Sequence, residues 1–209
     1  MKKQKTSTVK PMSSVLLIFI KNPRLGRVKT RLAQTVGDAE ALRIYHLLLE
    51  KTRLAALAAP VQRWLFYSEK IERNDGWDAQ YFFKKRQQGA DLGVRMAAAF
   101  RQAFEAGATR AVIIGSDCPD VNGALLETAF AKLEQFDFVL GPSLDGGYYL
   151  LGMTAFDPVV FENIPWSTDT VQALTLERIQ ALGKTCFLLP ELNDIDTAGD
   201  WKLFLKGQD

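Results

Sequence analysis

The stretch AVIIGSDCPD, residues 111–120, places two aspartates directly after a short apolar run. The run Ala111–Ile114 is typical of a buried strand, and Gly115 marks its end. Asp117 follows in the loop. Ligands of open α/β sheets bind beyond the carboxyl ends of the strands, so the stretch predicts a strand that delivers a carboxylate to a ligand site.

Length and composition are those of an ordinary globular protein. The chain has 209 residues, of which 47% are hydrophobic and 24% charged, and this allows a sizeable core. The net charge of +2 does not indicate nucleic-acid binding. Cys118 and Cys186 lack metal-ligand spacing, and His46 is the single histidine, so we expect neither a zinc site nor a Ser-His-Asp triad. We expect a cytoplasmic protein with reduced thiols.

The N-terminal segment is typical of a tail followed by a strand. Residues 1–14 are basic and polar, and the next apolar run ends at Lys21 after six residues. A signal peptide needs a longer run, and a membrane span needs about 18 apolar residues. We therefore expect a disordered tail over residues 1–14, one domain over residues 15–209 and no membrane span.

Apolar runs alternate with amphipathic helical patterns along the chain. Strands are predicted at Val15–Ile20, Val61–Tyr67, Tyr81–Phe83, Ala111–Ile114, Phe138–Leu140, Tyr148–Met153 and Cys186–Leu189, and helices at Asp38–Ala59, Asp91–Ala106, Asn122–Glu134 and Thr168–Leu182. This alternation favours a three-layer α/β/α architecture with a mainly parallel sheet. The run FVLGPSLDGGYYLLGM, residues 138–153, joins two strands through a Gly-rich turn and predicts a local antiparallel excursion.

A basic segment, KNPRLGRVKTRL (residues 21–32), follows the first predicted strand. Basic side chains and free backbone N–H groups at a strand end suit a phosphate group, although the spacing is not that of a Walker A motif. The alternative is a solvated basic loop, which the position after the first strand disfavours. We assign nucleotide or phosphate binding to Lys21, Arg24, Gly26, Lys29 and Arg31.

Asp117 has no obvious structural role. Asp120 or Asn122 can cap the helix that is predicted next, and this leaves Asp117 unexplained. A carboxylate with few neutralising neighbours suits a hard cation such as Mg²⁺, which takes one or two carboxylates together with phosphate oxygens. We therefore expect Asp117 to bind Mg²⁺ or Mn²⁺.

Two further segments contribute candidate residues. Asp145, Gly146 and Gly147 form either a hairpin turn or the floor of a substrate cleft, in which Asp145 would be a general base or would orient an acceptor. In IPWSTDT, residues 164–170, Trp166 is either core or a stacking platform. Ser167 or Thr168 is a plausible helix N-cap. We assign substrate binding to Gly146, Gly147, Trp166, Ser167 and Thr168.

The segment LNDIDTAGDW, residues 192–201, precedes a terminal helix. Thr197 is a fair N-cap, with Asp200 in the third helical position of an acidic variant of the capping box. This explains Thr197 and Asp200, but it leaves Asp196 without a structural role.

Five blocks occur in order over nearly the whole chain after about residue 14, namely KNPRLGRVKTRL, GSDCPD, GPSLDGGYYLLG, PWSTDTV and DIDTAGDW. Together they resemble the bacterial family of arsenosugar-biosynthesis-type glycosyltransferases, formerly a domain of unknown function. The resemblance implies the GT-A fold of the nucleotide-diphospho-sugar transferase superfamily. It also implies that Asp117 is the metal-binding aspartate after the central strand. Asp196, before Thr197, would then help to bind the metal, as in sugar-nucleotide cytidylyltransferases.

The first loop departs from one branch of that superfamily. It lacks the GGxGxRxG pattern of sugar pyrophosphorylases and is similar to the loop of phospholactate guanylyltransferases, which runs into a K-[ST]-R-L segment, here residues 29–32. This similarity keeps nucleotidyl transfer open as an alternative.

Three functions remain after these observations. The first is metal-dependent glycosyl transfer from a nucleotide-diphosphate sugar to a small-molecule acceptor. The alternative is guanylyltransferase-like nucleotidyl transfer with release of pyrophosphate, which the basic segment favours because a triphosphate carries more charge. The third is a non-enzymatic nucleotide sensor, and carboxylates at several predicted strand ends argue against it.

Overall fold

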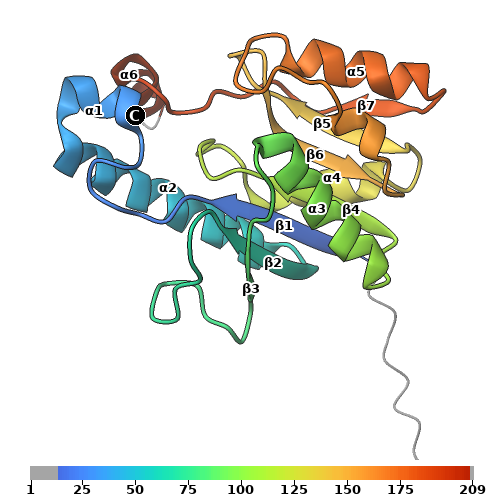
Figure 1. Cartoon of the computed structure of the whole chain (residues 1–209). Helices are drawn as coiled ribbons and strands as arrows, with labels where there is room; N and C mark the ends of the chain where they lie inside the picture. Colours follow the sequence, from blue (N-terminus) through green and yellow to red (C-terminus); the bar gives the residue numbers. More distant parts are fainter. Residues whose placement is uncertain (1–13, 208–209) are drawn as a thin grey trace, which may run out of the picture.

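The computed structural model describes residues 14–207 (Figure 1). The strands are β1 (Ser14–Ile20), β2 (Gln62–Tyr67), β3 (Phe83–Arg86), β4 (Arg110–Ile114), β5 (Phe138–Pro142), β6 (Tyr148–Met153) and β7 (Cys186–Leu188). The helices are α1 (Thr30–Val36), α2 (Asp38–Ala58), α3 (Leu92–Glu105), α4 (Gly123–Lys132), α5 (Val171–Ala181) and α6 (Ala198–Lys206), with a 3-10 turn η1 (Pro158–Phe161). The predicted tail lies outside the described residues, except for Ser14.

The strands form one sheet in the order β3-β2-β1-β4-β6-β5-β7. β1 pairs in parallel with β2 and β4, β2 with β3, and β5 with β7. β6 runs antiparallel to both of its neighbours, β4 and β5. The mainly parallel sheet and its antiparallel excursion are therefore confirmed.

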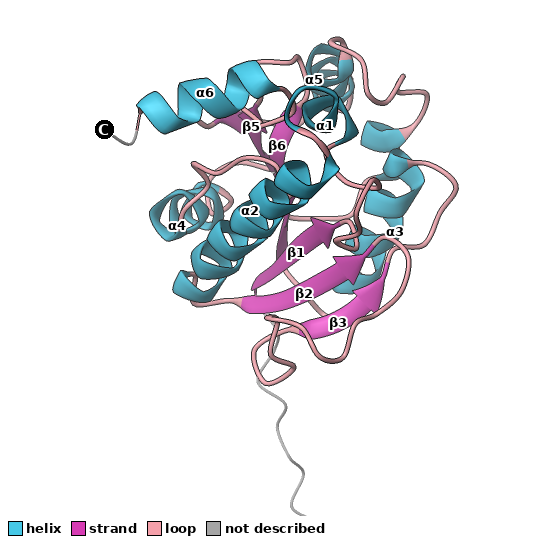
Figure 2. Ribbon diagram, turned by 90° about the vertical axis from the view of Figure 1, so that its left-hand side faces the viewer, coloured by secondary structure: helices cyan, strands magenta, loops and turns pink. Residues whose placement is uncertain are grey.

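Helices cover both faces of the sheet. Leu16 and Ile18 of β1 pack with residues of α2 and α4, whereas Val15 and Leu17 pack with residues of α3 and η1. Figure 2 shows α2 and α4 on one side of the strands and α3 on the other. Because both faces of β1 are buried, its sequence is a continuous apolar run rather than an alternation.

Two short segments differ from the prediction. β3 begins at Phe83 instead of Tyr81 because Tyr81 and Phe82 donate backbone hydrogen bonds to the Asp78 carbonyl in a turn, and the buried Phe82 ring packs against Trp77. A short helix, α1, stands between the basic segment and α2 and packs against α2 and α6. α1 and α6 lie side by side in both views (Figures 1 and 2).

The helix N-caps divide into confirmed and wrong predictions. Asn122 caps α4 by accepting from the Leu125 N–H, and Thr197 forms the predicted capping box with Asp200. The prediction that Ser167 or Thr168 caps α5 is wrong, because the helix begins only at Val171. The Thr168 hydroxyl instead donates to the Pro165 carbonyl in the preceding turn.

Candidate functional site

A pocket of about 710 Å³ opens at the carboxyl ends of β1 and β4 and at the start of β6. Its lining includes most of the predicted site residues, namely Lys21, Lys29, Arg31, Asp117, Asp145, Gly147, Trp166, Ser167, Thr168 and Asp196. Arg24, Gly26 and Gly146 do not line it. The antiparallel β6 interrupts the parallel order beside β4, and a change in strand order is where open α/β sheets form ligand crevices.

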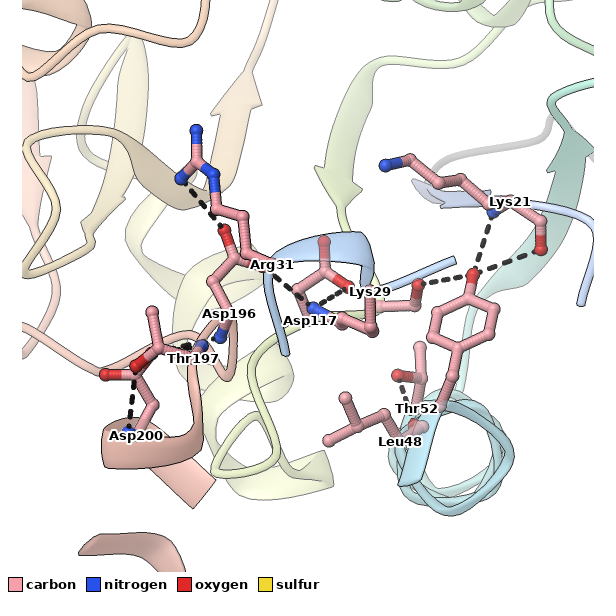
Figure 3. Close-up of polar contacts among 11 residues, drawn as sticks. Lys21, Lys29, Arg31, Leu48, Thr52, Asp117, Asp196, Thr197 and Asp200 are labelled. Carbon is pink, nitrogen blue, oxygen red and sulfur yellow. Dashed lines mark hydrogen bonds and ion pairs between the residues drawn. The ribbon is translucent and has the colours of Figure 1, made fainter. Parts of the chain in front are cut away.

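Lys29 joins the two aspartates that were predicted to bind metal. Its Nζ lies 2.6 Å from Oδ1 of Asp117 and 3.1 Å from Oδ1 of Asp196 (Figure 3). The two oxygens therefore cannot be farther apart than the sum of these distances. The Lys29 side chain is only 4% exposed, whereas those of Asp117 and Asp196 are 41% and 43% exposed.

The backbone around Lys29 is fixed by its neighbours. Lys29 has a left-handed φ of 49° and stands immediately before α1, and its carbonyl accepts the first helical bond, from the Ala33 N–H. Val28 and Leu32 on either side are buried. A non-glycine residue with positive φ persists where the surrounding packing determines it, so the ammonium is delivered to the carboxylates by a rigid turn.

Electrostatics keep Lys29 charged. Burial alone would lower the pKa of its ammonium, but attraction and hydrogen bonds from Asp117 and Asp196 outweigh burial and raise that pKa above its usual value. Arg31 lies farther out, with Nη1 3.8 Å from Oδ2 of Asp196 and a side chain that is 72% exposed. The buried pair of contacts is therefore the stronger electrostatic link.

Tyr45 of α2 connects the ends of β1 and β4 beneath the pocket. Its hydroxyl accepts from the Lys21 N–H at 2.9 Å and donates to the Lys21 carbonyl at 3.0 Å, and it lies 3.2 Å from Oγ of Ser116. Burial and the nearby Asp117 raise the pKa of this hydroxyl well above its usual value. It therefore stays protonated and holds Lys21 beside the loop that carries Asp117.

Asp194 is a pocket residue that the sequence analysis did not single out. Its Oδ1 is buried and has no hydrogen-bond partner among the described residues. Burial and the carboxylates of Asp117 and Asp145 raise its pKa to about 7. The sequence signal is the position of Asp194 and Asp196 on either side of the apolar Ile195, because side chains alternate along an extended segment and the two aspartates would then share one side.

Asp145 lies in the turn between β5 and β6. Its Oδ1 accepts from the Gly147 N–H at 2.9 Å, and the carboxylate is otherwise exposed at the pocket. Gly146 does not line the pocket, and a Cβ on it would lie 2.1 Å from the Asp169 carbonyl oxygen. Its φ of 83° and this close approach both require glycine.

Trp166 forms part of the pocket wall and is half-buried. Its indole lies across Gly93 of α3, where a Cβ would come within 2.3 Å of Nε1. The ring also meets Tyr148 edge to face, with centroids 6.5 Å apart. Trp166 is thus packed on one side and lines the pocket on the other, and its role as a stacking platform stays a prediction.

Among the residues that the structure describes, the other predicted phosphate-binding residues form no ion pair with Asp117 or Asp196. Arg24 forms an ion pair of 2.8 Å with Glu69 and does not line the pocket. Gly26, with a φ of 69°, shapes the turn before Lys29. Lys21 is exposed at the pocket.

Two negative findings concern the described part of the chain. Within residues 14–207, no group of three or more His, Cys, Asp or Glu side chains has the arrangement of a metal site. None of the helices in this range is long and apolar enough to cross a membrane.

Comparison with known structures agrees with this architecture. A "putative nucleotide-diphospho-sugar transferase" from Desulfovibrio desulfuricans G20 is 32% identical, with a TM-score of 0.86 over 95% of this chain and 89% of that chain. CMP:2-keto-3-deoxy-manno-octonic acid synthetase complexed with CTP is 12% identical, with a TM-score of 0.56 over 94% and 99%. 4-Diphosphocytidyl-2C-methyl-D-erythritol synthase from Anaerococcus prevotii DSM 20548 is 9% identical, with a TM-score of 0.56 over 93% and 98%. The last two show similarity of fold alone.

The family comparison covers the middle of the chain. Residues 52–168 match the family described as "Uncharacterized protein conserved in bacteria (DUF2064)". No match is found among curated proteins. The chain therefore belongs to the DUF2064 family and has the fold of the nucleotide-diphospho-sugar transferases.

Proposed function

We propose that the chain is a metal-dependent glycosyltransferase that uses a nucleotide-diphosphate sugar and a small-molecule acceptor. The observation that carries this proposal is the convergence of Asp117, Asp196 and Lys29 at one end of the pocket. The similarity to a solved structure called a nucleotide-diphospho-sugar transferase supports the class of substrate.

The donor atoms at this point fit a hard divalent cation. Two carboxylate oxygens converge on one position, and both side chains are about two-fifths exposed toward ligand and solvent. Mg²⁺ takes few protein carboxylates and completes its shell with phosphate oxygens and water. Asp117 and Asp196 would hold the ion, which when bound supplies neutralisation of the charge on the departing diphosphate.

The basic residues around the carboxylates would bind the diphosphate. Lys21 and Arg31 are exposed at the pocket, and the Lys29 ammonium lies between the two aspartates. Hydrogen bonds from charged donors to phosphate oxygens are about twice as strong as neutral ones. In the transition state these cations stabilise the negative charge that accumulates on the leaving diphosphate.

Asp145 would serve the acceptor. An acceptor hydroxyl oxygen forms a bond to the anomeric carbon while the bond from that carbon to the diphosphate oxygen breaks. The hydroxyl proton passes to the Asp145 carboxylate, and the nucleoside diphosphate leaves. Trp166 and Tyr148 offer an aromatic wall for the sugar or the acceptor. Membership of the arsenosugar-biosynthesis-type glycosyltransferases, which the sequence resembles, is part of this proposal.

Nucleotidyl transfer is the second candidate. The fold is shared with CMP:2-keto-3-deoxy-manno-octonic acid synthetase and 4-diphosphocytidyl-2C-methyl-D-erythritol synthase, and the basic segment suits a triphosphate. In this reaction a phosphate oxygen of the substrate attacks the α-phosphorus of a nucleoside triphosphate, and pyrophosphate leaves.

The proposal includes a cytoplasmic location, in keeping with free Cys118 and Cys186.

The released product distinguishes the two reactions. The chain is incubated with Mg²⁺ and either nucleotide sugars or nucleoside triphosphates, each with a pool of sugar and sugar-phosphate acceptors. Glycosyl transfer releases a nucleoside diphosphate, whereas nucleotidyl transfer releases pyrophosphate. A chain that releases neither, although it binds the nucleotide tightly, would support the nucleotide-sensor alternative.

A further inference from the structure

We propose that Lys29 is a resident counter-ion that occupies the position between Asp117 and Asp196 while the pocket holds no ligand, and that it must leave before a divalent cation binds there. Metal binding would then be coupled to nucleotide binding through one side chain. This inference rests on the proposed function, since it takes the two aspartates as the metal ligands.

Lys29 and a divalent cation would compete for the carboxylates of Asp117 and Asp196. The Lys29 ammonium already contacts an oxygen of each carboxylate, at 2.6 and 3.1 Å. A Mg²⁺ ion needs the same oxygens at about 2.1 Å. The two cations would therefore compete for the same oxygens, and like charges so close together repel strongly where solvent screening is weak. The 4% exposure of the Lys29 side chain means that little water is present to screen them.

Release of the carboxylates would require a change in the side chain of Lys29 but not in its backbone. Its backbone is held by the first turn of α1 and by the buried Val28 and Leu32. Lys29 itself lines the pocket in which the nucleotide phosphates would lie. A flexible ammonium can exchange one set of anionic oxygens for another without movement of the chain.

Arg31 is the other cation beside Asp196. Its guanidinium is 72% exposed and lies 3.8 Å from Oδ2. Of the two aspartates it contacts Asp196 alone, and it does not occupy the position between the two carboxylates. Arg31 carries the same charge as Lys29 in the same turn region, so it provides a matched control for a general effect of removing one positive charge.

The consequence is positive coupling. Without nucleotide, a divalent cation competes with a tethered ammonium and binds weakly. When phosphates attract Lys29, both carboxylates become available to the metal. Coupling between two ligands is reciprocal, so the metal must strengthen nucleotide binding by the same factor, and coupling factors of about 5–150-fold are typical.

The test uses the full chain and Mn²⁺ alone, with free Mn²⁺ measured by electron paramagnetic resonance. Lys29→Met keeps the length and apolar stem but removes the charge. We expect it to bind Mn²⁺ at least about five-fold more tightly than the wild type, the lower end of typical coupling. Arg31→Met should show a smaller gain, because its charge is exposed. Equal or weaker Mn²⁺ binding by Lys29→Met, with a native circular dichroism spectrum, would overturn the proposal.

A second measurement needs no variant and decides the matter if Lys29→Met does not fold. Lysine acylation of the wild type, followed by mass spectrometry, reports the accessibility of each ammonium. Labelling of Lys29 should be low in the free chain and should rise as Mg²⁺ is added to saturation, whereas labelling of Lys51 on α2 should not change. Unchanged Lys29 labelling at saturating Mg²⁺ would contradict the proposal.

These outcomes separate the inference from the proposed function. If Lys29→Met gains Mn²⁺ affinity but the chain responds to no nucleotide, the counter-ion role of Lys29 is supported and the proposed transferase function is contradicted. If the chain binds nucleotides with Mg²⁺ but its metal affinity does not depend on Lys29, the proposed transferase function is supported and the counter-ion role of Lys29 is contradicted.

Discussion

The backbone N–H of Ile195 donates a 2.9 Å hydrogen bond to the carbonyl of Asp117. This bond fixes the segment before α6 against the loop after β4. It brings Asp196 beside Asp117, although the two are far apart in sequence, and the Lys29 ammonium then joins their side chains. The site is therefore assembled by a backbone contact as well as by ion pairs.

Asp117→Asn and Asp196→Asn should each abolish the Mg²⁺ dependence of nucleotide binding. The physical reason is that each change removes one of two charged ligands for the same ion. Isothermal titration with a nucleoside diphosphate, with and without Mg²⁺, measures the effect. The double variant should lose much less than the sum of the single losses, because the two residues act on one ion.

Asp120→Asn is the control for these variants. Asp120 lies in the same loop as Asp117 and is exposed, and it does not line the pocket. It should retain the Mg²⁺ dependence. Additive losses from Asp117→Asn and Asp196→Asn would show that the two carboxylates act independently and hold no common ion.

Tyr45→Phe should lower the free energy of unfolding by about 1–3 kcal/mol, the cost of leaving buried polar groups unsatisfied. The lost hydroxyl bonds the N–H and carbonyl of Lys21 and contacts Ser116. Nucleotide affinity should fall as well, because the end of β1 carries the segment that we propose to bind phosphate. Urea denaturation gives the free energy.

Tyr81→Phe is the matched control, since Tyr81 is 49% exposed. It should change the free energy of unfolding by less than about 0.5 kcal/mol. If the two variants were equally stable, the Tyr45 hydroxyl would not be what connects β1 to β4.

Gly93→Ala should destabilise the chain and weaken sugar or acceptor binding. Alanine in a helix gains about 1 kcal/mol over glycine, but the new Cβ would come within 2.3 Å of the Trp166 indole, and overpacking costs about 1–3 kcal/mol or more. The clash should therefore dominate. Thermal melting and binding of a nucleotide sugar against its nucleoside diphosphate measure the two effects.

Gly76→Ala provides the comparison, because nothing lies within 4 Å of a Cβ at that position. It should leave binding unchanged. A Gly93→Ala chain that melts higher and binds the nucleotide sugar normally would show that Trp166 moves aside without cost and is not a fixed wall of the pocket.

Asp137→Asn should reduce stability at pH 7 but not at low pH. Hydrogen bonds from the Thr185 backbone and hydroxyl, together with Lys184, hold the pKa of the Asp137 carboxyl below its usual value. A depressed pKa contributes stability above the unfolded-state value of about 3.9, and that contribution is lost as pH falls through the folded-state pKa. Urea denaturation from pH 7 down to about pH 2 should show the difference from the wild type shrinking. A pH-independent difference would contradict the assignment.

Local patterns predicted most of the fold. Continuous apolar strands and amphipathic helices gave the three layers, and the Gly-rich turn at residues 145–147 gave the antiparallel β6. The capping box at Thr197 was readable because both partners lie within one turn of helix. The start of α5 was not readable, because Pro165–Thr170 forms a non-helical turn in which Trp166 packs on the distant Gly93.

The sequence predicted those pocket residues that directly follow strands. Asp117 and Asp196 were selected as candidates because neither had a local structural role, and the structure places them beside each other. The position of the Lys29 ammonium between them depends on the turn before α1 and on the Ile195 hydrogen bond to Asp117, and no local pattern encodes such a distance. The burial of Asp194 likewise follows from tertiary packing around the pocket.

The most direct test of the central claim is thermal melting of the wild-type chain with a panel of nucleoside diphosphates, triphosphates and nucleotide sugars, each with and without Mg²⁺. The account predicts that at least one nucleotide raises the melting temperature in Mg²⁺, with about 2.7 kcal/mol of added stability at 100 times its Kd, and that Asp117→Asn loses the Mg²⁺-dependent part. A panel in which no nucleotide raises the melting temperature, with Mg²⁺ or without it, would contradict the account.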